Sequence, residues 1–326
     1  MLWHDIHLAG TGAWIPRIRP RQGTSSQSPA DVNEYLSAAR STGDTAAEMA
    51  GRAALQALRD SGRGSSELSL IAHAGYRDDD HYTPVTYLQR VLNAPHALSV
   101  EIGAASNGGA AALVSAAEHL TARPEARAAL ITAGSLSSRL HDDRLEDEAG
   151  IVVGDGAAAA VLTREPGYAR LITTTHTSAP HLENLSRGTL TLQDFRLRRR
   201  MLLEDTGVAP YLTSLRECTH VSVLAALGEA ELTPSDISHT LVIAMGAPVI
   251  DVLLTGPPLF LSRTKSSWAF GRHTGHAGAC DILLALNHLL RTKQPAPGEH
   301  ILLISFGMGF RWTIAVLQTT ERPDAR

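Results

Sequence analysis

The stretch VEIGAASNGGAA, residues 100–111, joins a short apolar segment to a turn of small residues and then to an alanine-rich helix. Ser106 lies in the turn, where Gly and Ala neighbours let the backbone bend sharply and let another group come close. Free N–H groups and the dipole at the start of a helix favour developing negative charge. The stretch therefore predicts a strand–nucleophile–helix elbow. An ordinary Ser N-cap is the alternative, and this stretch alone does not decide between them.

The composition is that of an ordinary globular protein. The chain has 326 residues, of which 44% are hydrophobic and 19% charged, enough for a large core or two domains. A net charge of -4 gives no electrostatic reason to bind nucleic acid. The basic tract RLRRR at 196–200 is interpreted as a solvated helix face, or alternatively as a contact for phosphopantetheine or a carrier protein. Without a signal-peptide pattern or a bilayer-length apolar run, we expect a cytoplasmic protein with no membrane partner.

The remaining polar and sulfur-containing candidates carry less weight. Cys218 and Cys280 have neither a disulfide framework nor metal-ligand spacing, so we expect no metal and no redox cofactor. Cys280 is predicted to be a small buried residue, and no Gly-rich elbow follows Cys218. Structural roles are predicted for His73 and His273, and a role in turn geometry for Asp155.

Alternating strand and helix patterns predict an α/β architecture. We expect a polar surface excursion over residues 21–43, and a helix that begins with Asp44 as N-cap and stops at Gly62. Strands are expected at 6–13, 68–74, 98–102, 128–133, 169–175, 239–245, 301–306 and 312–317, and a strand–turn–strand unit around GDG at 151–162. Further helices are expected at 83–92, from the Ser106 turn to about residue 121, within 187–229 and at 279–290. The order of elements suggests a weak internal duplication divided near residue 165.

Four stretches together resemble the ketoacyl synthase III group of the thiolase superfamily. They are EIGAASNGGAAAL, GDGAAAAVL, TGHAGACDILLALNHLL and LLISFGMGFRWTIAVL. The resemblance implies a thiolase-like five-layered αβαβα fold with two pseudo-duplicated halves, and a homodimer. Residues 1–165 would form the N-terminal half with the nucleophile. Residues 166–326 would form the C-terminal half with the partner side chains and the Gly-rich hairpin.

Three departures from that group bear on the chemistry. Condensing members use Cys, His and Asn, whereas the matching positions here hold Ser106, Met245 and His276. Decarboxylative condensation needs two donors aimed at the thioester carbonyl, and a Met thioether cannot donate a hydrogen bond. The departures put standard condensing chemistry in doubt.

The same departures supply a base with an orienting acid. Asp281 follows His276 by five residues, so its carboxylate could reach back from the next helix and hold Nδ1–H, leaving Nε2 to face Ser106. A serine hydroxyl needs such a base more than a cysteine thiol does. Ser106, His276 and Asp281 are therefore predicted to form a Ser-His-Asp triad. This combination is similar to that of ketosynthase III-like acyltransferases and starter-unit proteins of antibiotic biosynthesis.

The resemblance also implies an oxyanion hole made by the backbone N–H groups of Ser106 and Met308. We expect an acyltransferase that takes an acyl group from CoA or an acyl carrier protein, forms an acyl-serine, and passes it to a carrier thiol or to a hydroxyl or amine of a natural product. Two alternatives stay open: a starter-unit β-ketoacyl synthase III that condenses with malonyl-carrier protein, and a non-catalytic partner subunit.

Overall fold

The computed structural model describes residues 1–20, 33–75, 81, 83–137, 151–185 and 208–321. The basic tract 196–200 lies outside the described residues. The fold is mixed α/β with a large central sheet, as the sequence predicts. Within the described ranges, no helix is both long and apolar enough to cross a bilayer.

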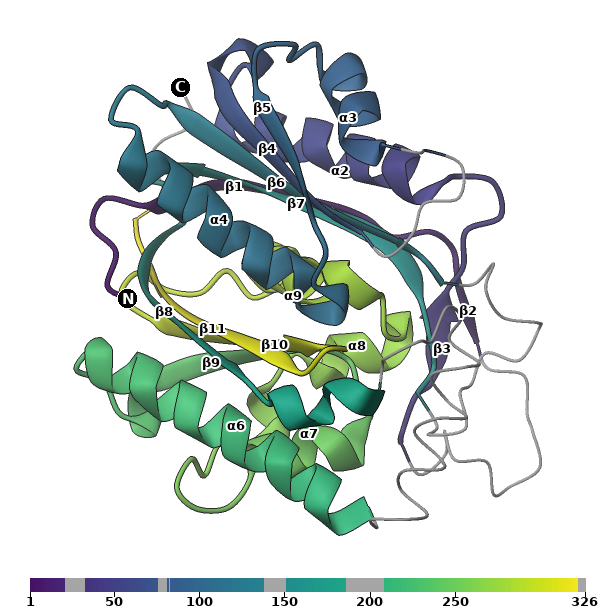
Figure 1. The fold of residues 1–326 in the computed structure, drawn as a ribbon, viewed down its shortest axis with the longest axis vertical. Helices are drawn as coiled ribbons and strands as arrows, with labels where there is room; N and C mark the ends of the chain where they lie inside the picture. Colours follow the sequence, from purple (N-terminus) through teal and green to yellow (C-terminus); the bar gives the residue numbers. More distant parts are fainter. Residues whose placement is uncertain (21–32, 76–80, 82, 138–150, 186–207, 322–326) are drawn as a thin grey trace.

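The described strands and helices alternate along most of the chain (Figure 1). The strands are β1 (His7–Trp14), β2 (Ile18–Pro20), β3 (Ser37–Ala39), β4 (Leu68–Gly75), β5 (Leu98–Ile102), β6 (Ala128–Leu136), β7 (Asp155–Thr163), β8 (Ala169–Ser178), β9 (Ile237–Val242), β10 (His300–Gly307) and β11 (Arg311–Thr319). The helices are α2 (Ala46–Ser61), α3 (Pro84–Leu92), α4 (Gly108–Ala122), α6 (Val208–Glu229), α7 (Ala247–Leu254), α8 (Trp268–Thr274) and α9 (Asp281–Thr292).

Nine of these strands form one hydrogen-bonded series in the order β5-β4-β6-β7-β1-β8-β11-β10-β9. The join between β1 and β8 is short, with only the pairs His7↔Arg170 and Leu8↔Ala169. The sheet therefore divides at this join into two leaves. The first leaf has the order β5-β4-β6-β7-β1, and the second has the order β8-β11-β10-β9. Figure 1 shows the leaves one above the other, with α4 and α9 between them. The first leaf is drawn from the N-terminal part of the chain and the second from the C-terminal part. The division at residue 165 stays a prediction.

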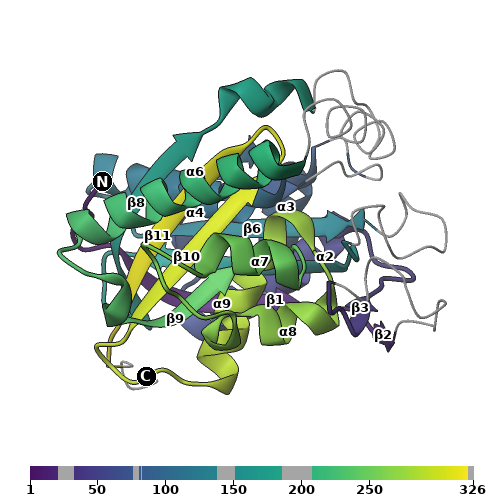
Figure 2. The same ribbon diagram turned by 90° about the horizontal axis from the view of Figure 1, so that it is seen from below.

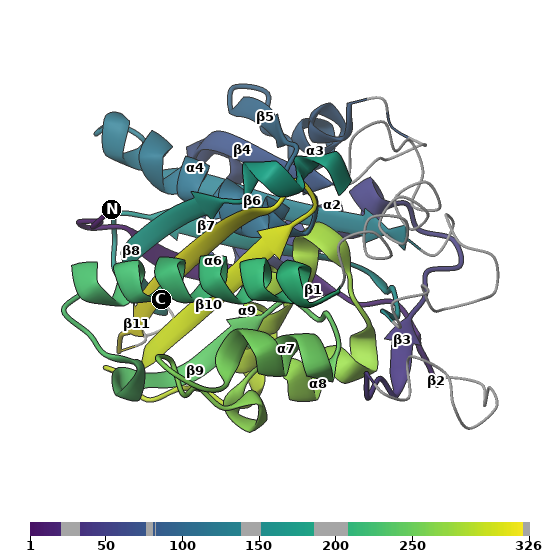
Figure 3. The same ribbon diagram turned by 60° about the horizontal axis from the view of Figure 1, so that its bottom comes forward.

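Side chains alternate between the two faces of each leaf, because successive residues of a strand point to opposite sides. In β7, Ala158, Ala160 and Leu162 pack toward α4 and α9, whereas Ala157, Ala159 and Val161 pack toward α2 and α3. In β10, Ile301 and Leu303 face inward, whereas Leu302, Ile304 and Phe306 face α6 and α7. Figures 2 and 3 show α6 and α7 over the outer face of β10 and β11. The result is five layers, helix–sheet–helix–sheet–helix.

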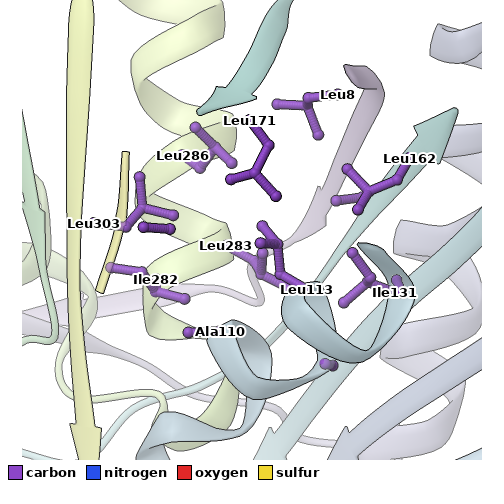
Figure 4. Close-up of a cluster of buried hydrophobic side chains, with 14 of the residues drawn as sticks. Leu8, Ala110, Leu113, Ile131, Leu162, Leu171, Ile282, Leu283, Leu286 and Leu303 are labelled. Atoms are coloured by element: carbon purple, nitrogen blue, oxygen red, sulfur yellow. The ribbon is translucent and has the colours of Figure 1, made fainter. Parts of the chain in front are cut away.

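The middle layer is held by a cluster of buried hydrophobic side chains between the two leaves (Figure 4). Leu113 of α4 and Leu283 of α9 lie between Ile131 of the first leaf and Leu303 of the second, each no more than 1% exposed. Burial of such side chains contributes roughly 1.5–3 kcal/mol each. This cluster fixes α4 and α9 against each other, and both helices begin at the same end of the molecule (Figure 1).

Two expectations for the first 62 residues are wrong in part. The polar stretch 21–43 was expected at the surface, but Tyr35, Ala38 and Arg40 are at least 91% buried because Ser37–Ala39 pairs with Ile18–Pro20 and packs inward. The next helix is capped by Thr45, not by Asp44. Thr45 and Glu48 form a reciprocal capping box, whereas Asp44 accepts hydrogen bonds from Trp14 and Arg52.

Two later expectations also need correction. GDG is not a turn between two strands: Val152 and Val153 make only isolated bridging contacts, and β7 begins at Asp155. The strand expected at 239–245 spans Ile237–Val242 instead. The apolar run continues past that point, but the Met245 N–H turns back to the Ile243 carbonyl, 2.9 Å away, and so leaves the ladder.

Candidate active site

Ser106 lies on a strained turn between β5 and α4. A 3₁₀ turn, η2 (Ala105–Asn107), follows the strand, and Ala105 has the left-handed φ of 48° that non-glycine residues rarely adopt. The N-cap residues of η2 and α4 are Ala104 and Asn107, so the capping interpretation of Ser106 is wrong. The turn places the half-buried Ser106 side chain at the start of α4, where the helix dipole favours a negative charge.

The two glycines after this turn bring α4 against the segment that carries the other candidate residues. A Cβ on Gly108 would lie 2.9 Å from the Cβ atoms of Ala74 and Ala279, and a Cβ on Gly109 would lie 2.6 Å from the Ala279 carbonyl. Contacts this short exclude any side chain. Gly108 and Gly109 therefore set the distance between the Ser106 turn and η7 (Gly278–Cys280), which leads into α9.

The backbone of His276 is clamped by the segment before β7. Its N–H donates to the Val152 carbonyl at 2.7 Å, and its carbonyl accepts from Gly154 N–H at 2.8 Å. Gly275 has a φ of 76°, and a Cβ on Gly154 would lie 2.2 Å from the Thr274 carbonyl. The segment before β7 thus holds the His276 backbone through two hydrogen bonds. The close approach of the Thr274 carbonyl explains why position 154 is a glycine.

Ser106, His276 and Asp281 form a continuous series of hydrogen bonds. Ser106 Oγ lies 2.8 Å from His276 Nε2, and His276 Nδ1 lies 2.5 Å from Asp281 Oδ2. Since the carboxylate only accepts, Nδ1 carries the proton, and Nε2 accepts from the Ser106 hydroxyl. The His276 and Asp281 side chains are 12% and 5% exposed, so water screens this pair weakly.

Asp281 is held by backbone groups as well as by the histidine. It is the first residue of α9, where the helix dipole favours a negative charge. Its Oδ1 accepts from Ala277 N–H at 2.6 Å, and its Oδ2 also accepts from Ala244 N–H at 2.9 Å. The carboxylate therefore has one orientation, which fixes the tautomer and the ring plane of His276.

The β10–β11 hairpin packs on the backbone of the turn that carries Ser106. A Cβ on Gly307 would lie 2.8 Å from Ser106 N and 2.7 Å from Asn107 N. The hairpin backbone at 307 thus packs directly on the amides of the turn, with Met308 next along the chain. This is the place where Ser106 and Met308 were predicted to form an oxyanion hole.

Asn107 ties the turn to β11 through its side chain. It was not singled out from the sequence. It is 3% exposed, and its Nδ2 donates to Thr313 Oγ1 at 3.0 Å. Thr313 Oγ1 in turn lies 3.4 Å from His176 Nδ1. The asparagine next to the candidate serine was the available signal, but an Asn at a helix start is also an ordinary capping residue.

The remaining candidates lie outside this series of hydrogen bonds. Cys280 is fully buried, and burial, reinforced by Asp281, raises the pKa of its thiol well above the usual value, so it is not a thiolate. Burial lowers the pKa of His73 to about 4, and its Nδ1 pairs with Thr132. Asp155 is 1% exposed and accepts from Ser41 N–H. Met245 is half-buried in the loop after β9.

Comparison with known proteins gives a consistent result. Models of the 3-oxoacyl-[acyl-carrier-protein] synthase III family match residues 100–179, and models of its C-terminal domain match 227–319. A solved structure of ChlB3, described as an acyltransferase, is 31% identical, covers 97% of this chain and 98% of its own, and superposes with a TM-score of 0.87. The chain belongs to the 3-oxoacyl-[acyl-carrier-protein] synthase III family.

Other members of the synthase III family extend this finding over the full length. The β-ketoacyl-[acyl-carrier-protein] synthase III of Nostoc sp. is 25% identical over 332 residues, covering 96% of this chain and 98% of its own. The structure of 3-oxoacyl-[acyl-carrier-protein] synthase III from Aquifex aeolicus is 22% identical, with a TM-score of 0.78, and covers 96% of this chain and 99% of its own. At this identity the second likeness supports the thiolase-like fold alone.

Proposed function

We propose that this chain is an acyltransferase in which Ser106 is the nucleophile, His276 the general base and Asp281 the residue that orients it. The observation that carries the proposal is the pair of contacts at 2.8 and 2.5 Å that joins the serine hydroxyl to a buried carboxylate through one imidazole. A serine hydroxyl must lose its proton as it attacks, and this arrangement accepts that proton. The likeness to ChlB3 supports the same reaction class.

The first half-reaction transfers an acyl group from a thioester to the serine. Ser106 Oγ attacks the acyl carbon, its proton moves to His276 Nε2, and the oxyanion is stabilised by the N–H groups of Ser106 and Met308. The C–S bond then breaks, and His276 gives the proton to the leaving thiolate of CoA or of a carrier-protein phosphopantetheine. The product is an acyl-serine ester.

The second half-reaction reverses the proton movements with a different acceptor. His276 takes a proton from a carrier thiol, or from a hydroxyl or amine of a natural-product scaffold, as that group attacks the ester. Collapse of the second oxyanion returns the proton to Ser106 Oγ. Every step uses groups of this chain and its two substrates, so we propose that no metal or redox cofactor takes part. We also propose that the protein works as a homodimer.

Condensing synthase activity is the alternative that the named relatives favour. It needs a second donor on the thioester carbonyl, and the loop after β9 offers the thioether of Met245 where the synthases have a histidine. His276 alone would have to support loss of CO2 from a malonyl group. We therefore place acyl transfer ahead of condensation.

Intact-protein mass spectrometry after incubation with a panel of acyl-CoAs tests the proposal. We expect a covalent acyl adduct with the parent chain and none with Ser106→Ala. An adduct together with CO2 release from malonyl-carrier protein would instead support the synthase. If no donor in the panel leaves an adduct, the chain is a non-catalytic partner subunit.

A further inference from the structure

We infer that Tyr35 is a positioning residue that sets the orientation of Asp281 through the backbone of Ala244. The inference rests on the proposed function, because it assigns Tyr35 to the alignment of the His276–Asp281 pair. The Tyr35 hydroxyl donates to a backbone carbonyl, so its effect on the reaction would pass through that backbone. It comes from the other half of the chain, 209 residues before Ala244.

The Tyr35 hydroxyl has a specific buried partner. The side chain is 2% exposed, and its hydroxyl donates to the Ala244 carbonyl at 2.5 Å. The ring packs edge-on against Trp268, with centroids 4.9 Å apart and an interplanar angle of 76°. The aromatic packing orients the ring, and the hydroxyl then fixes the position of one backbone residue.

That backbone residue is one of the groups that hold the proposed triad acid. Ala244 N–H donates to Asp281 Oδ2 at 2.9 Å, and the same oxygen accepts from His276 Nδ1 at 2.5 Å. Ala244 lies in the irregular loop beyond β9, where no ladder partner fixes the chain. The Tyr35 hydroxyl does this instead, so a shift of Ala244 would disturb the oxygen that orients the imidazole.

The residues beside Tyr35 attach its segment firmly to the second half. Glu34 makes two hydrogen bonds with the Arg263 guanidinium, at 2.7 and 3.3 Å, and these hold the pKa of Glu34 below its usual value. The Glu34 carbonyl accepts from Arg272 Nε, and the Asn33 carbonyl accepts from Ala247 N–H at 3.1 Å. Residues 33–35 thus bind segment 244–247 at both ends, at Ala244 through Tyr35 and at Ala247 through Asn33.

A serine nucleophile gives this alignment a catalytic consequence. Misplacing a catalytic group by about 1 Å can cost roughly 100-fold in rate. A cysteine in the same position is partly ionised near neutral pH and depends less on an aligned base. The effect of losing the Tyr35 hydroxyl should therefore depend on which nucleophile is present, which a purely structural role would not produce.

The experiment measures the single-turnover rate of adduct formation for Tyr35→Phe in three backgrounds: the parent, Ser106→Cys and Asp281→Asn. We expect about a 10- to 100-fold loss in the parent with unchanged donor affinity. We expect a loss of less than about threefold in Ser106→Cys, and almost none in Asp281→Asn, because residues that act through one another are not additive. Tyr168→Phe is the matched control, since it removes a 2.5 Å hydroxyl bond to Asp60 and should leave the acylation rate unchanged.

Equal losses in the Ser106 and Ser106→Cys backgrounds would overturn the inference and make Tyr35 a structural residue only. An unchanged rate in the parent background would overturn it as well. If Tyr35→Phe does not fold, Glu34→Gln, which loosens the same segment from its half-exposed side, should show the same nucleophile dependence at smaller size, and its absence overturns the inference. If the parent chain forms no adduct at all, it is the proposed function that fails.

Discussion

Gly307 packs on the amide of Ser106 so closely that a methyl group at position 307 would lie 2.8 Å from that nitrogen. The space in front of the amide is where the oxyanion of an acyl-transfer intermediate would be bound in the proposed reaction. The β10–β11 hairpin and the turn that carries Ser106 are therefore built against each other, and the first prediction concerns this contact.

Gly307→Ala should reduce the acylation rate by at least about 100-fold, the usual cost of losing one oxyanion donor. The added methyl must push the hairpin away from the turn, because its neighbours are backbone atoms of Ala104, Ser106 and Asn107. Single-turnover adduct formation measures the loss. Gly228→Ala is the matched control, since a Cβ there has open space around it, and it should acylate normally. A Gly307→Ala variant as fast as the parent would exclude the hairpin from the oxyanion site.

Asp281→Asn should lower the acylation rate by about 10³- to 10⁴-fold while leaving donor binding intact. Whichever way the amide is turned, its NH₂ group faces an N–H donor, either that of Ala277 or those of His276 and Ala244. With the NH₂ group at the Oδ2 position, the imidazole loses the acceptor that keeps its proton on Nδ1. In the other orientation the Ala277 N–H loses its acceptor, and an uncharged amide no longer stabilises the imidazolium that forms during attack. Adduct formation at saturating donor checks this, with Asp236→Asn, which alters an exposed carboxylate that accepts from Thr233 N–H, as control. An unchanged rate for Asp281→Asn would mean that no triad operates.

Ala105 stores backbone strain next to Ser106, with a φ of 48°. Ala105→Gly relieves about 1 kcal/mol of that strain and loses a similar amount through a more flexible unfolded chain, so its free energy of unfolding should stay within about 0.5 kcal/mol of the parent. Ala105→Val should cost more than about 1 kcal/mol, because a β-branched side chain fits a left-handed backbone poorly. Urea unfolding of the two variants checks this. Equal losses for Gly and Val would show that packing, and not strain, governs the position.

His73 should make the folded state acid-sensitive between pH 6.5 and about 4. Burial lowers its pKa from 6.5 to about 4, so in this window the unfolded chain binds a proton that the folded chain does not. The free energy of unfolding should therefore fall as the pH drops, by roughly 3 kcal/mol on reaching pH 4. Urea titrations at pH 7 and pH 4.5 should show a smaller fall for His73→Gln than for the parent. A parallel fall in both would exclude His73 as the source.

Much of the fold could be predicted from local patterns because most of its long strands are strongly apolar. The strand 98–102 and the hairpin around FGMGF lie where periodicity and glycines indicate. The end of β9 could not be predicted, since the run HTLVIAM stays apolar beyond the last ladder bond. Helices α7 and α8 were missed because each has eight residues or fewer, too short for a clear period.

The candidate site likewise contains residues that the sequence could predict and residues that it could not. Ser106 and His276 could be singled out because each stands at a family motif position with an unusual residue type, and Asp281 because it follows His276 by five residues. Asn107, Ala244 and Tyr35 could not, because their contacts depend on tertiary packing. The Tyr35 hydroxyl meets a carbonyl 209 residues away, and no pattern around either residue indicates that meeting. Tyr35 also lies in a stretch whose polar composition pointed to the surface.

The sequence separation of 170 between Ser106 and His276 has a consequence for how the protein folds to its active form. Neither leaf with its own helices contains a complete site, so acylation competence can appear only after both have formed and docked. Long-range contacts of this kind form late in folding, after local helices and hairpins. The recovery of adduct formation during refolding should therefore lag behind the recovery of helical circular dichroism, and the length of that lag measures the docking step alone.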